Sequence, residues 1–157
     1  MKIGGYGFRE HLRLLSPLFA LIAAVFFLRL ILAAADTPAG IVRIISVTTT
    51  TSAAILLAVV LIHVRQAGGY ANVVMASLLI NGWAQLLVIG AIVFTVLTGV
   101  RNIYTYPEYS IVPYDPNHTR HILGHLSGGV GVGTLEGAAG GCLLLWLLRT
   151  FAPVRQK

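Results

Sequence analysis

Four long apolar stretches, each bounded by polar or turn-forming residues, dominate the pattern along the chain. A helix needs about 20 apolar residues to cross the hydrocarbon core of a bilayer, and each stretch has roughly that length. None of them alternates between apolar and polar positions, as a barrel strand would. The pattern therefore predicts four membrane-spanning helices, over Leu14–Ala35, Ile44–Val64, Val73–Val96 and Leu126–Leu148.

The breaks between these stretches consist of residues that end helices. Asp36–Gly40 follows the first stretch, Gln66–Gly69 follows the second, and a Tyr- and Pro-rich segment with three prolines precedes the last. Proline and glycine are the strongest local signals of turns and loops. No internal repeat divides the chain, so we predict a single all-α domain over residues 1–157, an integral membrane four-helix bundle.

Composition supports a membrane protein. The 157 residues are 57% hydrophobic and 10% charged, whereas roughly 25% of the residues of a soluble domain are charged. The net charge of +6 could indicate nucleic-acid binding, but the basic residues stand singly around the apolar stretches and form no patch. We therefore expect the lipid bilayer, and no nucleic acid, as a partner.

The basic residues also predict an orientation, because Lys and Arg accumulate in short cytoplasmic loops. With the N-terminus inside, more of them lie inside than outside, which favours N-in/C-in, an external Tyr/Pro-rich loop and a plasma (inner) membrane. The start of the chain also resembles a signal peptide ending at Ala33–Ala35, but Arg29 would interrupt its apolar region, so we favour an uncleaved span. The inner set is Lys2, Arg9, Arg13, Arg65, Arg149, Arg155 and Lys157.

Polar side chains within the spans are the first candidates for function, because charge at membrane depth is costly. Glu136 lies about 15 Å into the last span and Arg29 about 9 Å from the outer end of the first, so the two could pair. Ser77, Asn81 and Gln85 share one face of the third span. We expect Arg29, Glu136, Asn81 and Gln85 to form an ion path. The alternative is that these groups only hold the helices together.

Glycines recur every four residues in the last span, at Gly129, Gly133, Gly137 and Gly141. A face without side chains lets another helix approach closely, so we interpret this face as a packing surface. The helix that it meets belongs either to the same chain or to a homo-oligomer or membrane-protein partner. A nucleotide-binding loop is excluded, since no strand precedes the glycines and no Gly-Lys-Ser/Thr follows them.

Three histidines precede the last span. Asp115 and Pro116 are typical of the start of a helix, and in that helix His118, His121 and His125 would share a face. Imidazole is the commonest ligand of transition metals, so the three are a candidate site for a divalent metal such as Zn. The alternatives are a proton relay or plain interfacial histidines. We do not expect haem, because His63 and His125 lie near opposite membrane surfaces.

Together these features predict a small multi-pass carrier or channel component. In this hypothesis a His-rich external mouth collects a cation or a proton, and Glu136 carries it further. One alternative is a non-catalytic subunit or assembly factor that packs through the glycine face. A metal-dependent membrane enzyme is the third hypothesis, although no nucleophile or general-base pattern is present, so no catalytic residue is assigned.

Overall fold

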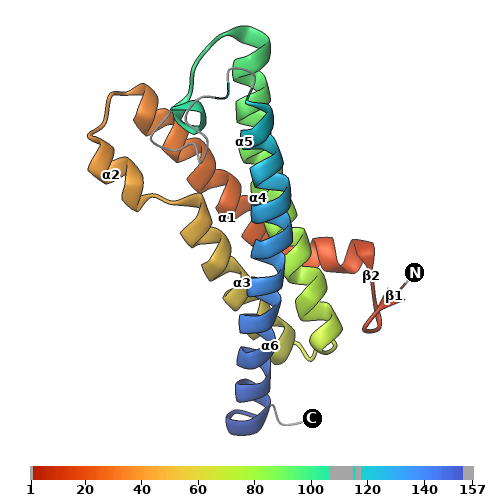
Figure 1. Ribbon diagram of the computed structural model, residues 1–157. Helices are drawn as coiled ribbons and strands as arrows, with labels where there is room; N and C mark the ends of the chain where they lie inside the picture. Colours follow the sequence, from red (N-terminus) through yellow and green to blue (C-terminus); the bar gives the residue numbers. More distant parts are fainter. Residues whose placement is uncertain (1, 107–114, 116–117, 154–157) are drawn as a thin grey trace.

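The computed structural model describes residues 2–106, 115 and 118–153, and it is helical apart from one short hairpin (Figure 1). The hairpin is formed by β1 and β2, which pair antiparallel. Helix η3 is a π-helix and η1 a 3-10 helix. The elements are β1 (Lys2–Ile3), β2 (Tyr6–Gly7), α1 (Phe8–Ala34), α2 (Ala39–Ile44), α3 (Val47–Val64), α4 (Tyr70–Thr98), η1 (Ile103–Thr105), α5 (Thr119–Gly124), η3 (His125–Val132) and α6 (Gly133–Phe151).

The four predicted long helices are confirmed. The helical segments Phe8–Ala34, Ala39–Val64, Tyr70–Thr98 and Thr119–Phe151 are each long and apolar enough to cross a membrane. Large apolar side chains point outward from them, as in Ile44, which is 82% exposed, and Leu97, which is 79% exposed. A soluble monomer rarely presents so much contiguous apolar surface. The chain is therefore compatible with a small membrane protein.

Helices α3 and α4 form the centre of the bundle, because they pack against each other and each also packs against α1 and α6. Figure 1 shows α5, η3 and α6 stacked end to end as one column, with α3 beside the lower part and α2 turned away above. The buried core lies where α1, α3 and α6 meet α4, and includes Ile22, Val59, Ile80, Ile92 and Leu145. The bundle therefore has two ends, one holding α2 and α5 (the histidine end) and one holding the α3–α4 turn and the end of α6 (the terminal end).

The second predicted span is divided in the structure. The expected helix Ile44–Val64 begins only at Val47, and α2 precedes it as a separate helix. Ser46 caps α3, because its hydroxyl accepts a hydrogen bond from the backbone N–H of Thr49 (3.3 Å), and a serine in this position favours a helix start. The polar residues around this break thus end the apolar run and place α2 at an angle to α3.

A short N-terminal hairpin closes the terminal end and has no counterpart in the sequence prediction. Gly4 turns it with φ +56°, and a Cβ there would collide with the side chain of Asn72. The Asn72 amide donates to the carbonyl of Ala67 (2.8 Å) and is buried at 1% exposure. Pro17 removes one backbone hydrogen bond within α1, and Figure 1 shows the first turns of α1 lying across the bundle.

Candidate functional site

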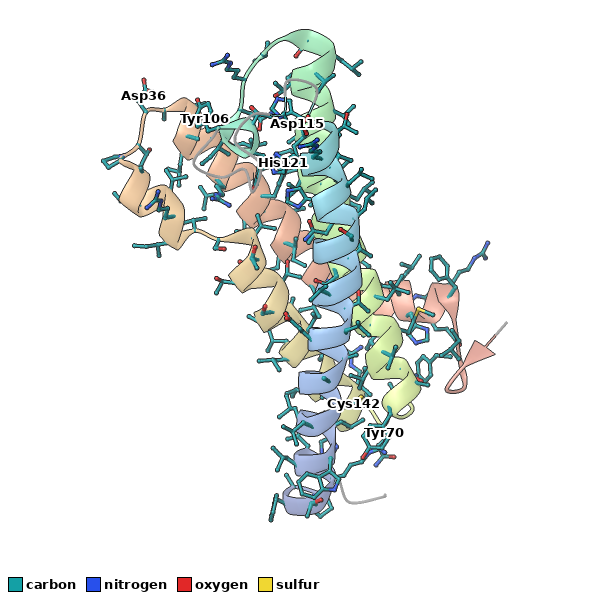
Figure 2. All side chains as sticks on the ribbon, viewed as in Figure 1. Asp36, Tyr70, Tyr106, Asp115, His121 and Cys142 are labelled. Atoms are coloured by element: carbon teal, nitrogen blue, oxygen red, sulfur yellow. The ribbon has the colours of Figure 1, made fainter. Side chains whose placement is uncertain are left out.

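The last helix starts later than the sequence predicts. We expected Asp115 to cap it and Pro116 to be its first residue, but α5 begins at Thr119, after His118 in a left-handed conformation (φ +52°). The Asp115 carboxylate still caps the helix, accepting hydrogen bonds from the backbone N–H groups of Arg120 (2.5 Å) and His121 (3.2 Å). It reaches them from outside the helix because the left-handed residue turns the chain just before the first turn. Figure 2 shows Asp115 and His121 at the same end of the bundle as Asp36 and Tyr106.

His121 and His125 form a hydrogen-bonded pair that faces α4. Their Nε2 atoms are 3.1 Å apart, and His125 Nδ1 lies 2.7 Å from Gln85 Oε1 on α4. His121 is only 3% exposed. His118 lies farther out, with its ring centre 6.3 Å from that of His121. The structure therefore joins two of the three predicted histidines to Gln85, which the sequence placed on the polar face of a different helix.

The hydrogen bonds fix which ring nitrogens carry protons. Gln85 Oε1 can only accept, so His125 Nδ1–H donates to it. A neutral His125 then has a lone pair on Nε2, and His121 Nε2–H donates to that atom. The remaining nitrogen, His121 Nδ1, is buried and has no hydrogen-bond partner in the part of the chain that the structure describes. A proton that arrives at the pair therefore has an open acceptor at His121 Nδ1.

The same pair supplies two ligands for a metal, and the described residues supply no more. The region described contains no group of three or more His, Cys, Asp or Glu side chains arranged to hold a metal ion. Asp115 is used as a helix cap, and Glu108, which we considered as a ligand, lies outside the described residues together with Tyr109 and Tyr114. The metal site over His118, His121 and His125 stays a prediction.

Arg29 and Glu136, which the sequence allowed to pair, occupy different surroundings. The Arg29 guanidinium carbon lies 5.4 Å from the ring centre of Tyr104, whereas Glu136 lines a groove in which Arg29 has no part among the described residues. Helices α3 and α4 both pack against α1 and against α6, and so they separate the helix of Arg29 from that of Glu136. Burial raises the pKa of Tyr104 to about 12, partly offset by the charge of Arg29, so this phenol stays neutral beside the guanidinium.

The glycine face of the last helix packs against the polar face of α4 in the same chain. A Cβ on Gly129 would lie 2.3 Å from Gln85 Cδ, and one on Gly133 would lie 3.0 Å from Asn81 Oδ1. The last helix and α4 are antiparallel, so moving four residues forward in the last helix, from Gly129 to Gly133, moves the contact four residues back in α4, from Gln85 to Asn81. The last position of the series is closed by valines, with a Cβ on Gly141 2.7 Å from Val73 Cγ1.

A polar groove opens beside this contact. It is a cavity of about 340 Å³ between α3 and the η3–α6 column, over α4. The predicted path residues Asn81, Gln85 and Glu136 all line it, while Arg29 does not. Gln85 thus belongs both to the groove and to the histidine pair, and so it connects His121 and His125 with the groove that Glu136 lines. We call this groove, lined by Thr51, Ser52, Ile55, Asn81, Gln85 and Glu136, the α3/α6 groove.

Two features of the site were missed in the sequence. One is the α3/α6 groove itself: the hydroxyl-rich run Thr48–Ser52 was interpreted mainly as a helix-packing feature, with the lining of a hydrated path as the alternative, and it lines the groove through Thr48, Thr51 and Ser52. The other is the π-helix His125–Val132, where we expected a regular α-helix. Its glycines gave a hint, because glycine weakens an α-helix, and π segments often occur at functional sites.

Comparisons of the chain with models of protein families, with curated proteins and with solved structures found no match.

Proposed function

We propose that the chain is a small membrane carrier component that handles a proton or a cation. The observation that carries this proposal is the chain of hydrogen bonds from His121 to His125 to Gln85, which leads into the groove that contains Glu136. Imidazole exchanges protons near neutral pH. An ionisable residue at membrane depth is typical of ion and proton pathways.

The groove supports a carrier rather than an open channel. At Gly141 the contacts between α3, α4 and α6 are apolar, made by Val59 and Val73, and Leu145 is buried one turn further along α6. The polar lining of the groove is therefore separated from the terminal end by an apolar layer at Gly141. A site open toward one side and closed toward the other is what alternating access requires at a given moment.

The orientation is part of the proposal and has its own test. Arg65 and Arg149 lie at the terminal end, where the Arg149 guanidinium donates to the carbonyl of Gly68 (2.8 Å), and positive residues favour the cytoplasm. Reporter fusions after Gly68 and after Lys157 should therefore read cytoplasmic, and fusions near Thr37 and Tyr106 should read external. Two inverted readings would overturn the orientation without affecting the site.

The function is tested by proton flux in liposomes that enclose a pH-sensitive dye. His125→Ala should lower the flux by tenfold or more, because it removes the link between His121 and Gln85, and Glu136→Gln should lower it as strongly. His63→Ala is the matched control, since His63 donates to the carbonyl of Ala152 (2.8 Å) at the opposite end. Flux that is equal in the parent and in both site variants, all with unchanged melting temperature, would refute the proposal.

A second candidate function is that of a non-catalytic subunit. The observation that favours it is the exposure of Glu136 and of the neighbouring Gly140 on the open side of α6, where a helix of another chain could cover the carboxylate. Small residues at membrane depth favour such contacts. Purification at low detergent concentration, followed by mass measurement of the intact complex, separates the two functions, because a subunit is recovered with its partner in fixed ratio.

A further inference from the structure

The α3/α6 groove presents mostly hydrogen-bond acceptors. The Thr51 hydroxyl donates to the carbonyl of Val47 (2.7 Å) and the Ser52 hydroxyl donates to the carbonyl of Thr48 (3.2 Å). Their protons are used within α3, so both hydroxyls offer lone pairs to an occupant of the groove. Such bonding to the preceding turn is common for Ser and Thr in helices.

On the floor of the groove, formed by α4, a polar side chain again uses a proton within its own helix and leaves an oxygen as an acceptor. One N–H of the Asn81 amide donates to the carbonyl of Ser77 (3.0 Å), so the Asn81 oxygen remains as an acceptor. Glu136 adds a carboxylate, and it is the one charged side chain among the described residues that line the groove. Gln85, whose oxygen is occupied by His125, adds N–H donors to the lining. The one full charge among these described residues is nevertheless negative, so an occupant that carries positive charge and donates hydrogen bonds matches the groove better than an anion.

The size of the groove points to an organic cation. A water molecule occupies about 30 Å³ of liquid volume, and the groove holds about 340 Å³, so a bare metal ion would leave it largely unfilled. Apolar side chains also line it, among them Ile55, Leu56 and Val132. Pockets with a few polar groups and apolar walls are typical of sites for small organic molecules.

We propose that the α3/α6 groove binds a small primary ammonium compound with an apolar body. The ammonium group pairs with the Glu136 carboxylate and donates to Ser52 Oγ and Asn81 Oδ1, while the apolar body lies along Ile55 and Leu56. The ammonium compound would be the cargo of the carrier proposed above. Only its transport rests on that proposed function, because its binding is measured without any flux.

The first test uses benzylammonium chloride with the purified protein in lipid nanodiscs and isothermal titration calorimetry. We expect saturable binding of one molecule per chain, tenfold or more tighter than that of benzyltrimethylammonium, which cannot donate hydrogen bonds, and of benzyl alcohol, which has no charge. Glu136→Gln should weaken it by tenfold or more, a factor that corresponds to about 1.4 kcal/mol. Asp36→Asn removes a carboxylate outside the groove and should change nothing.

The second test fills the groove without removing its charge. Gly140 lines it and a Cβ there meets nothing within 4 Å, so Gly140→Leu should fold normally and abolish benzylammonium binding. Gly131→Leu is the matched control, because that glycine is equally free of neighbours but does not line the groove. This arm keeps the proposal testable if Glu136→Gln does not fold.

Three outcomes would overturn the proposal. One is binding of benzyl alcohol as tight as that of benzylammonium, and another is benzylammonium binding that survives both Glu136→Gln and Gly140→Leu. The third is a change of oligomeric state, and not of ammonium binding, in Gly140→Leu, which would assign the groove to another copy of the chain. The proposed function is tested separately by proton flux. A protein can bind benzylammonium without conducting protons, and it can conduct protons without binding benzylammonium.

Discussion

Gly141→Leu is expected to lower the free energy of unfolding by about 3 kcal/mol, the upper end of the range for overpacked cores. Gly141 is buried between two helices, and an added Cβ would lie 2.7 Å from Val73 Cγ1 and 3.1 Å from Val59 Cγ2. Valine is branched at Cβ and has few alternative rotamers, so neither neighbour can turn aside. The measurement is thermal unfolding of the detergent-solubilised protein, where we expect a drop of several degrees.

The adjacent residue provides the control for this change. Gly140→Leu adds the same side chain to the same helix, but toward open space, and should leave the melting temperature within a degree or two of the parent value. The comparison cancels the gain in helix propensity, which is similar for both substitutions. Equal melting temperatures for the two variants would show that the glycine face does not pack as the structure has it.

Zinc is expected to stop proton flux by bridging His121 and His125. Zn²⁺ binds imidazole nitrogen at about 2.0–2.1 Å, and two such bonds to the Nε2 atoms 3.1 Å apart would make an angle of about 100°, close to the tetrahedral value. Gln85 holds the proton of His125 on Nδ1, so that Nε2 can coordinate, which is a common support for a bound metal. Zinc would replace the hydrogen bond between the two Nε2 atoms, and the proton of His121 would move to its Nδ1. We expect one zinc ion per chain, with flux reduced by tenfold or more at pH 7.5.

The dependence of zinc binding on pH has a definite sign. Imidazole coordinates only when neutral, so zinc affinity should fall as the pH drops into the range where His121 and His125 take up protons. The charged and titratable groups near the pair are Asp115 and His118. Competition with a chromophoric chelator measures the affinity. If His125→Ala binds zinc as tightly as the parent does, the metal binds elsewhere. His63→Ala is the control and should bind zinc like the parent, because His63 lies at the opposite end of the bundle.

The four membrane-spanning segments could be predicted because each is specified by the residues of its own stretch of sequence. A run of about 20 apolar residues specifies a membrane helix by itself, and glycine, proline and charged residues mark where each run ends. The break before Val47 was missed because Ser46 stands alone between apolar residues, Ile44 and Ile45 before it and Val47 after it, and one serine does not reveal the junction of two helices. The hairpin Lys2–Gly7 was missed because it depends on a contact with the distant residue Asn72.

The site could be predicted in its parts and not in its assembly. The spacing of His121 and His125 placed both on one helix face, and the spacing of Asn81 and Gln85 placed them on another. Nothing in either spacing says that the two faces meet. A pairing of Arg29 with Glu136 was considered possible from depth alone, but depth does not give the order of helices around the bundle, in which α3 and α4 both pack between α1 and α6.

The π-helix His125–Val132 gives the last helix a joint. Each of its hydrogen bonds spans one more residue than in an α-helix. The extra residue can move to the neighbouring turn, so that this segment becomes α-helical while the helix as a whole stays intact. Such a shift would rotate α5 and its histidines relative to α6, while the glycines below stay seated against α4. Helix α5 with His121, and His125 just after it, can therefore rotate and shift slightly relative to the groove, while α6 keeps its contacts with α4.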